Sequence, residues 1–368
     1  MTLRLSNYDA SPTIAIVDNS TMDFAGKAKC ADAISVGDDS IILKKANKEY
    51  SIDRNVCSPC DYFHDGDIVK IAENGIVYKL YDASTDDATI FVTGECNSNC
   101  IMCPCSDWER KTNTGMPDDW LIDFITLLPT GLRNIVVTGG EPTLKTDQFF
   151  LVLKMIAEKY PFAEVLLLTN GRSFSAKTMI ERLNECCPQH LLAAIPLHGE
   201  IDIMHDSITR SPGSFRQTLA GIQNLLDAGI DIEIRIVVSK INCTHLSEIA
   251  QLICDQLPKV RIVNFVGLET LGNCAKNFKS VYIEQVDASK YIKPAVEILA
   301  NAGIDVSLYN YVLCAVDRGL WTLCKKSISP YKVRFPDECE TCTLKNCCGG
   351  FFGSTLSVAK PQVEPIHL

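Results

Sequence analysis

The sequence lacks any hydrophobic run long enough to cross a membrane. Its uninterrupted apolar stretches, such as Ile135–Val137 and Val165–Leu168, have the length of strands, whereas a membrane-spanning helix needs about 20 apolar residues. An excess of positive charge is also missing, because 35 Lys and Arg stand against 45 Asp and Glu. With a net charge of −10, the chain gains no general attraction to nucleic-acid phosphates. We therefore expect neither a membrane nor DNA as a partner.

Internal repeats and low-complexity tracts are absent, and the first residues lack the charged and apolar regions of a secretory signal. Hydrophobic residues make up 46% of the 368 positions, which is typical of a globular protein. A chain of this length exceeds what one hydrophobic core usually supports. We expect a cytoplasmic protein with one large domain and at least one smaller domain.

Cysteine is the residue type with an unusual distribution. The 18 cysteines are too sparse for a disulfide scaffold, in which cysteine exceeds about 8–10%. In a reducing cytoplasm, clustered thiols bind metal or take part in chemistry more often than they form crosslinks. One pair, Cys57 and Cys60, has no second pair nearby, and we interpret it as a coincidence.

The chain divides into three regions. Residues 1–86 predict a small β-rich domain, in which Asn74-Gly75 joins two alternating segments and indicates a hairpin with a type I′ turn. In residues 87–302, short apolar runs alternate with longer amphipathic segments, which is the pattern of parallel βαβ units. Residues 303–368 have little periodicity and many cysteines, so we expect a metal cluster in place of a hydrophobic core.

The middle region predicts six strands with helices between them. The predicted strands are Ile90–Thr93, Asn134–Thr138, Val165–Thr169, Leu192–Leu197, Ile232–Val238 and Ile262–Val266. The predicted helices are Asp118–Leu128, Thr146–Tyr160, Ser175–Cys187, Ser214–Ala228, Thr244–Gln256 and Ile283–Ala302, with Ser175 and Gly229 as caps. Six βα units are fewer than the eight of a full barrel. We predict an α/β fold, a partial (β/α)6 TIM-like barrel whose site lies at the carboxyl ends of the strands.

Three cysteines directly follow the first predicted barrel strand, with the spacing Cys96-x3-Cys100-x2-Cys103. Three thiolates from one loop can bind three irons of a [4Fe–4S] cube. The fourth iron then keeps an open position, which is typical of a reactive metal site. Cys105 follows in a Cys-Pro-Cys step and is a poor fourth ligand. A zinc knuckle or three incidental cysteines are the alternatives for this spacing alone.

A second motif, Thr138-Gly139-Gly140-Glu141-Pro142, ends the second predicted strand. Two glycines let the backbone approach a ligand closely, and a carboxylate beside them can hold an ammonium group. An ordinary strand-to-helix turn is the alternative. Because both loops follow barrel strands, we expect them to lie side by side at the same end of the barrel.

Together, the two motifs resemble those of the radical S-adenosylmethionine (SAM) superfamily. The resemblance implies that the three cysteines hold a [4Fe–4S] cluster whose free iron binds the amino and carboxylate groups of SAM. The cluster would pass one electron to the sulfonium, which would give methionine and a 5′-deoxyadenosyl radical that abstracts hydrogen from a substrate. The resemblance also implies that the amine and the adenine of SAM are lined by Gly139, Gly140, Glu141 and Met102.

Three positions on later strands are further candidates for contact with SAM or substrate. Arg235, within the fifth strand, is placed to pair with the SAM carboxylate, and an ion pair at the strand edge is the alternative. Asn242, just beyond that strand, matches a position that often holds a polar SAM contact. His198 stands in Pro196-Leu-His-Gly199, where relatives commonly have Ser-Leu-Asp-Gly. It would contact ribose or substrate, or cap the strand.

The second cysteine cluster has the spacing Cys339-x2-Cys342-x5-Cys348. Three thiols alone would leave the site open, so a fourth, upstream cysteine is expected. Cys314 is our candidate and Cys324 its competitor. Four thiolates satisfy either a [4Fe–4S] cluster or a zinc ion, and we favour an auxiliary [4Fe–4S] cluster.

Cys347 competes with its neighbour Cys348, and the five-residue spacing before Cys-Gly-Gly favours Cys348. This tail resembles the auxiliary-cluster domains of peptide-modifying radical SAM maturases in their short, four-cysteine form. With Leu320-Trp321 and Ser327-Ile-Ser329, it looks most like the C-type maturases of the His-Xaa-Ser system.

The resemblance implies an enzyme that modifies a ribosomally synthesised peptide with His-Xaa-Ser repeats. It also implies a second radical SAM maturase as partner and a reductant protein such as flavodoxin or ferredoxin. The alternatives are a radical SAM enzyme that acts on a small molecule or an RNA base, and a non-catalytic iron–sulfur partner subunit. The segment Asp107-Trp-Glu-Arg110 is expected to face the substrate entrance, where Trp108 would pack over the cluster or a peptide.

Overall fold

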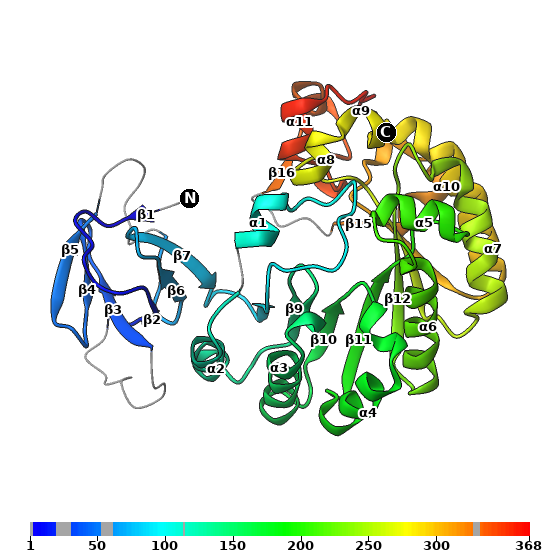
Figure 1. Cartoon of the computed structure of the whole chain (residues 1–368). Coiled ribbons are helices and arrows are strands. Elements are labelled where there is room, and N and C mark those ends of the chain that lie inside the picture. Colours follow the sequence, from blue (N-terminus) through cyan, green and yellow to red (C-terminus); the bar gives the residue numbers. More distant parts are fainter. Residues whose placement is uncertain (1–2, 20–30, 53–61, 113–114, 327–331) are drawn as a thin grey trace.

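The computed structural model describes residues 3–19, 31–52, 62–112, 115–326 and 332–368. Cys57, Cys60 and the Ser327–Ser329 segment lie outside these described residues. Figure 1 shows a small β unit, a curled sheet with helices on its outer face, and a C-terminal segment that lies at the top of the view, above the upper end of that sheet. In the described part of the chain, no helix combines the length and the apolar character needed to span a membrane.

The N-terminal unit is a seven-stranded sheet with the order β1-β7-β6-β2-β3-β4-β5. Its strands are β1 (Leu3–Arg4), β2 (Thr13–Val17), β3 (Asp32–Val36), β4 (Ser40–Leu43), β5 (Lys48–Ser51), β6 (Ile68–Ile71) and β7 (Ile76–Tyr81). β2 and β3 run parallel, and the other neighbours run antiparallel. A bridge between Leu5 and Ile52 joins the two outer strands, so the sheet curls towards closure.

The turn between β6 and β7 differs from the predicted type I′ turn. Gly75 has a φ of +75°, whereas Asn74 is not among the residues with positive φ, and a type I′ turn needs positive φ at both positions. The N–H of Gly75 donates to the carbonyl oxygen of Ala72 at 2.9 Å. The turn is therefore centred one residue earlier, and Gly75 follows it as a left-handed bulge residue.

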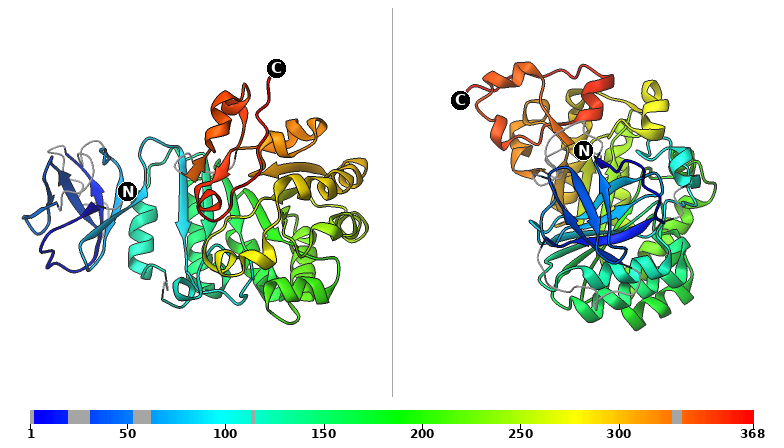
Figure 2. Two further views of the ribbon diagram at one scale, coloured as in Figure 1. Left: turned by 90° about the horizontal axis from the view of Figure 1, so that it is seen from above. Right: turned by 90° about the vertical axis from the view of Figure 1, so that its left-hand side faces the viewer.

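The N-terminal unit packs against α2 (Asp118–Leu127) on one flank of the barrel (Figure 2). The buried Oδ2 atom of Asp123 accepts a hydrogen bond of 2.8 Å from the N–H of Ala31. Ile14 and Ile68 belong to the same buried cluster as the core of the barrel. The unit is therefore joined to the barrel by both apolar packing and a buried hydrogen bond.

The larger sheet confirms the predicted partial barrel. Its parallel strands lie in chain order: β8 (Asp87–Phe91), β9 (Asn134–Thr138), β10 (Glu164–Leu168), β11 (His190–Pro196), β12 (Asp231–Val237), β13 (Ile262–Val266), β14 (Asp305–Tyr309) and β15 (Cys324–Lys325). The first six are the predicted strands. β14 and β15 come from the region that was predicted to be a cysteine-rich extension, and they continue the sheet at its far edge.

Alternate residues of each strand pack under the helices, and the residues between them face the inside of the curl. Ile232, Ile234 and Ile236 of β12 are fully buried in the main core, which leaves Glu233 and Arg235 on the inner face. The helices of the outer layer are α2, α3 (Thr146–Lys159), α4 (Lys177–Cys186), α6 (Ser214–Asp227), α7 (Leu246–Gln256) and α10 (Gln285–Asn301) (Figure 1).

Shorter helices lie near the carboxyl ends of the strands, where sequence periodicity gave no signal. They are α1 (Asp107–Thr112), α5 (Asp202–Thr209), α8 (Gly272–Lys276) and α9 (Phe278–Val281). Gly229 follows α6 with a φ of +79°, as predicted for a cap. The predicted cap at Ser175 is wrong: α4 begins at Lys177, and the Ser175 hydroxyl donates to the carbonyl oxygen of Arg172 within a preceding 3-10 turn.

Candidate active site

The cysteine loop, residues 96–103, follows β8 at the carboxyl end of the barrel. On one side, the N–H of Asn99 donates to the carbonyl oxygen of Thr209, at the end of α5, at 2.9 Å. On the other side, the carbonyl oxygen of Cys103 accepts from the N–H of Asn273, in α8, at 2.9 Å. The loop is therefore held by hydrogen bonds between two short helices that come from distant parts of the sequence.

The side chains of Asn273, in α8, and Asn277, between α8 and α9, form further hydrogen bonds with the cysteine loop. The Nδ2 atom of Asn273 donates to Asn99 Oδ1 at 2.7 Å and to the carbonyl oxygen of Cys100 at 3.2 Å. Asn277 donates to the carbonyl oxygen of Ile101 at 3.2 Å. A Cβ atom on Gly272 would lie 2.3 Å from the carbonyl oxygen of Pro104, so this position needs glycine. Sequence reasoning missed this segment because nothing local marks it.

The three thiols of the loop influence one another. Burial raises the pKa of Cys100 to about 12 and also raises the pKa of Cys96. A hydrogen bond with Cys105 lowers the pKa of Cys103. The negative charge of Cys103 is one of the causes that raise the pKa values of Cys96 and Cys100. All three cysteines are partly buried.

Three desolvated thiols in one loop suit a large cationic group. Burying thiolates without a partner costs free energy, and a metal cluster offsets that cost. Within the described ranges, no three Cys, His, Asp or Glu side chains surround a single metal ion. The thiolates of a [4Fe–4S] cube bind different irons, so they need not converge on one point. The cysteine loop therefore fits a cube.

The two glycines after β9 bring their own loop against the start of the cysteine loop. A Cβ atom on Gly139 would lie 2.3 Å from the carbonyl oxygen of Thr93, and one on Gly140 would lie 2.4 Å from that of Glu95. The N–H groups of Gly140 and Glu141 donate to the same two carbonyl oxygens, each at 2.7 Å. The two loops lie side by side, as expected, but the glycines serve protein packing.

The carboxylate of Glu141 is fully occupied inside the protein. It is 0% exposed and accepts hydrogen bonds from the hydroxyls of Thr143 and Thr169 and from the N–H of Asn170. Burial raises its pKa, while the hydrogen bonds act in the opposite direction. The predicted contact between this carboxylate and an ammonium group stays a prediction.

Two other predicted cofactor residues also have partners within the protein. Met102 is buried in a small apolar cluster with Ile208 and Cys274. Asn242 is buried, and its Oδ1 accepts from the N–H of Ser239 at 2.8 Å. Its Nδ2 donates to the carbonyl oxygen of His198 at 3.2 Å. Asn242 therefore ties the ends of β11 and β12 together at the edge of the site.

His198 lies at the end of β11 as a buried neutral ring. The backbone N–H of His198 donates to Nδ1 of His205 at 3.2 Å, and the two rings stack with centroids 5.6 Å apart. Burial lowers the pKa of His198 well below its ordinary value, and the charge of His205 lowers it further. Nδ1 of His198 is buried without a hydrogen-bond partner. It is therefore the predicted residue with a free polar atom at the barrel mouth.

Arg235 lies inside the barrel, below the strand ends. Its Nε donates to Glu233 Oε1 at 2.5 Å, which supports the ion-pair interpretation over a SAM contact. The sheet register places Arg235 beside Asn264 of β13, whose two side-chain polar atoms are buried without a partner. Tyr309 is near enough for the charge of Glu233 to raise its pKa, after the larger effect of burial. The interior of the barrel therefore contains a group of neighbouring polar side chains.

Two arginines beside the cysteine loop were not predicted as site residues. Arg172 donates to the carbonyl oxygen of Asn97 at 2.6 Å and to the hydroxyl of Ser98 at 2.9 Å. Arg110 of α1 lies on the opposite side, with only 9% of its surface exposed. Trp108 of the same helix is 71% exposed. The residue of this segment that is buried beside the cysteine loop is therefore the arginine.

The second cysteine cluster forms a pocket in the C-terminal segment. Four cysteines are among the residues that line this pocket, namely Cys314, Cys339, Cys342 and Cys348. Burial, together with the charges of the other three thiols, raises the pKa of Cys339 to about 11. The N–H of Ile366 lies 3.4 Å from the Sγ atom of Cys342, so the end of the chain packs over the pocket.

The two competing cysteines lie elsewhere. Cys347 is exposed and does not line the four-cysteine pocket. Cys324, in β15, packs against the main barrel core, and its thiol donates to the carbonyl oxygen of Leu320 at 3.7 Å. The structure therefore brings together the set with Cys314 and Cys348.

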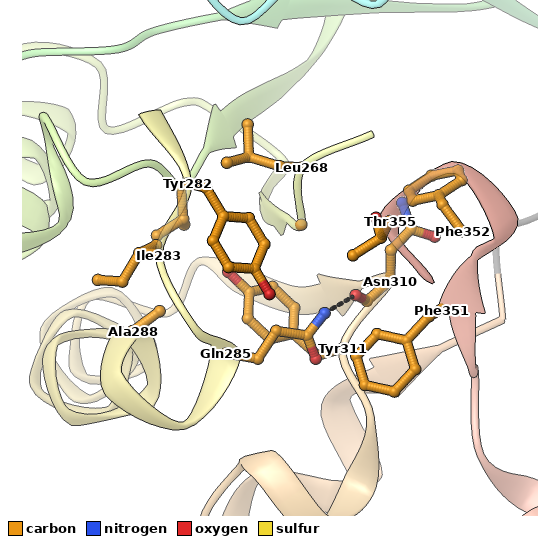
Figure 3. A pocket seen from close by; sticks show the side chains of 12 residues that line it. Leu268, Tyr282, Ile283, Gln285, Ala288, Asn310, Tyr311, Phe351, Phe352 and Thr355 are labelled. Atoms are coloured by element: carbon orange, nitrogen blue, oxygen red, sulfur yellow. Dashed lines mark hydrogen bonds between the residues drawn. The ribbon is translucent and has the colours of Figure 1, made fainter. Parts of the chain in front are cut away.

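A further pocket lies between the barrel and the C-terminal segment (Figure 3). Tyr282 and Phe351 face it from opposite sides. Gln285 donates to the carbonyl oxygen of Asn310 at 2.8 Å and accepts from the N–H of Val312 at 2.9 Å. This side chain fixes α10 to the end of β14, from which the chain continues to the four-cysteine pocket.

Known proteins with related sequences agree with this site. Residues 90–253 match the sequence profile of the radical SAM superfamily. GTP 3′,8-cyclase of Campylobacter curvus is 25% identical over 227 residues, which cover 60% of this chain and 68% of that protein. The sporulation killing factor maturation protein SkfB of Bacillus subtilis is 23% identical over 198 residues, which cover 53% of this chain and 46% of that protein.

The fold is also similar to a solved structure. Streptococcus suis SuiB, crystallised with S-adenosylmethionine, matches with a TM-score of 0.51 at 12% identity, over 72% of this chain and 56% of that one. The chain thus spans about half the length of SuiB and of SkfB. Residues 90–253 of this chain therefore match the radical SAM superfamily in sequence, and the chain is similar in fold to SuiB.

Proposed function

We propose that this chain is a radical SAM enzyme that modifies a ribosomally synthesised peptide and holds an auxiliary [4Fe–4S] cluster in its C-terminal segment. The observation that carries the proposal is the presence of two separate thiol sets. Three thiols in the cysteine loop leave an iron open for SAM. Four thiols around the second pocket can close a cluster. One set suits a reactive site, and the other suits a fully ligated cluster.

In this proposal, the cluster in the cysteine loop supplies one electron for cleavage of SAM to methionine and a 5′-deoxyadenosyl radical. Cys96, Cys100 and Cys103 would hold it at the barrel mouth. The backbone of Gly139 and Gly140 would border the methionine end of SAM. The apolar cluster around Met102 would keep water away from the adenine side.

The peptide substrate is supported by SkfB, which is named as a maturation protein, and by the four-cysteine pocket. We include in the proposal a His-Xaa-Ser peptide, a second radical SAM maturase as partner, and a flavodoxin or ferredoxin as reductant. Cys314, Cys339, Cys342 and Cys348 are the proposed auxiliary ligands.

A nucleotide is the second candidate substrate, because the relatives include GTP 3′,8-cyclase. A triphosphate needs unpaired cations along its binding site. Arg235, inside the barrel, is already paired with Glu233. The net charge of −10 also disfavours a polyanionic substrate. These observations favour the peptide.

The decisive experiment is anaerobic reconstitution followed by iron, sulfide and zinc analysis. We expect about eight irons per chain, and about four in the Cys96/Cys100/Cys103→Ala variant, because each cube holds four. With dithionite and SAM, a His-Xaa-Ser peptide should increase 5′-deoxyadenosine formation and gain a modification, whereas GTP should not. Zinc in place of four irons would contradict the auxiliary cluster. Turnover of GTP instead of the peptide would establish the nucleotide function.

A further inference from the structure

Arg110 is a buried cation beside the cysteine loop. Its Nη2 donates to Asn99 Oδ1, within the loop, and to Asp107 Oδ1 at 2.5 Å. Its Nη1 lies 3.5 Å from the carbonyl oxygen of Cys105. Asn99 also accepts from Asn273 at 2.7 Å. The guanidinium is therefore held in place against the loop from both sides.

The charged side chains around Arg110 are more exposed than its guanidinium. Asp107 is shared, because its second oxygen lies 3.3 Å from Nζ of Lys276 in α8. Asp107 and Lys276 are 44% and 58% exposed, whereas Arg110 is 9% exposed. Glu109, on the same helix, binds the N–H of Ser106. The two carboxylates equal the two cations, Arg110 and Lys276, in number, but Arg110 is the buried member of the group and contacts the cysteine segment.

The guanidinium contacts the cysteine segment at two positions. Asn99 directly precedes Cys100, and Cys105 follows Cys103 by two residues. Arg110 is therefore a buried cation against the segment that carries the three proposed cluster ligands.

We propose that Arg110 sets the reduction potential of the cluster in the cysteine loop, by favouring the reduced, more negative state; this inference rests on the proposed function. One-electron reduction by an external donor, such as dithionite or a flavodoxin-type protein, adds one negative charge to the cluster and its three thiolates. No bond breaks and no proton moves in this step. A fixed cation nearby stabilises the added charge. Removal of Arg110 therefore makes reduction harder, and removal of Asp107 makes it easier.

The test is an anaerobic redox titration followed by electron paramagnetic resonance, on the reconstituted full chain. The signal that changes on addition of SAM identifies the cluster of the cysteine loop. Arg110→Gln should lower the ratio of reduced to oxidised cluster at a fixed potential on the order of tenfold, which is 59 mV for one electron. Asp107→Asn should raise that ratio. Lys276→Gln, an exposed cation in the same network, should change it less than about twofold.

Arg110→Gln and Asp107→Asn break the same ion pair, so a loss of loop stability would shift the reduction potential in the same direction in both variants. An electrostatic effect shifts it in opposite directions. Shifts in the same direction, or shifts below twofold in both variants, overturn the inference. If Arg110→Gln does not retain iron in the cysteine loop, Asp107→Asn decides alone, and only a raised ratio supports the inference. A wild type with no SAM-responsive signal overturns the proposed function as well, and its iron content distinguishes this result from a failure of the inference alone.

Discussion

The carboxylate of Glu141 and the N–H of Asn170 form a hydrogen bond of 2.6 Å that joins the loops after β9 and β10. The same carboxylate accepts from the hydroxyls of Thr143, at 2.6 Å, and Thr169, at 2.8 Å. Every described donor to it comes from the barrel itself. Glu141 therefore acts as an internal anchor that sets the spacing of adjacent loops at the barrel mouth.

We expect Glu141→Gln to lower the free energy of unfolding by about 1–3 kcal/mol, because the amide replaces one acceptor with a donor that faces other donors. Urea denaturation of the purified apoprotein measures this. Glu164→Gln, at an exposed position at the start of β10, is the matched control and should stay within about 0.5 kcal/mol. Equal effects of the two substitutions would contradict the anchoring role.

Gly140 offers a steric test of how the two loops pack. A Cβ atom there would lie 2.4 Å from the carbonyl oxygens of Gly94 and Glu95, so Gly140→Ala must displace the strand end that leads into the cysteine loop. We expect a loss of about 1–3 kcal/mol in stability and a lower iron content after reconstitution. Gly131→Ala is the control, because no atom lies within 4 Å of the added methyl. An unchanged iron content in Gly140→Ala would show that the packing of the glycine loop does not affect cluster binding by the cysteine loop.

The barrel could be predicted because its signals are local. Each of the six predicted strands is a short apolar run next to an amphipathic helical segment. Both patterns can be recognised within one short stretch of sequence. β15 has only two residues, Cys324 and Lys325, and its extended conformation comes from pairing with Leu308 and Tyr309. Such a strand has no pattern of its own, so the sequence could not predict it.

The candidate site also contains residues that could be predicted from local sequence and residues that could not. The spacing from Cys96 to Cys103 and the Gly139-Gly140 pair are local, and both could be identified from sequence. Asn273 and Arg172 reach the cysteine loop across more than seventy residues. Their roles depend on which helix packs against which loop, and a single sequence does not contain that information.

The four-cysteine pocket predicts unequal effects of neighbouring cysteines. Cys314→Ala should remove the auxiliary cluster, with the iron content falling from about eight to about four, because Cys314 lines the pocket. Cys324→Ala should retain the iron, because that thiol packs on the barrel core. Cys348→Ala and Cys347→Ala form a second pair with the same expectation. Loss of iron in Cys324→Ala but not in Cys314→Ala would reverse the assignment of the fourth ligand.

The buried histidine pair predicts a loss of stability in mild acid. Burial lowers the pKa of His205 from 6.5 to about 4, so the unfolded chain binds more protons between these values. Stability is present above 6.5 and is lost as the pH falls towards 4. The contribution of His205 to the free energy of unfolding therefore falls by about 2 kcal/mol between about pH 7 and about pH 5. Urea denaturation of wild type and His205→Asn at the two pH values measures it.

Asn is chosen because its Oδ1 can replace Nδ1 of His205 as the acceptor for the N–H of His198 and does not ionise. The variant should therefore lose about 2 kcal/mol less than the wild type on acidification. A parallel decline in both proteins would show that His205 is not responsible for the acid sensitivity.

The Arg235–Glu233 pair distinguishes an ion pair from a SAM contact. Glu233 is buried, and the pair is separated by 2.5 Å, so Arg235→Met leaves an uncompensated carboxylate and should cost about 3 kcal/mol of stability. Removing both charges in Arg235→Met/Glu233→Met should restore most of that loss. If Arg235 serves the barrel alone, the double variant, once reconstituted, binds SAM within about threefold of the wild type. A double variant that folds normally but loses tenfold or more in SAM affinity, about 1.4 kcal/mol, would instead assign Arg235 to the cofactor.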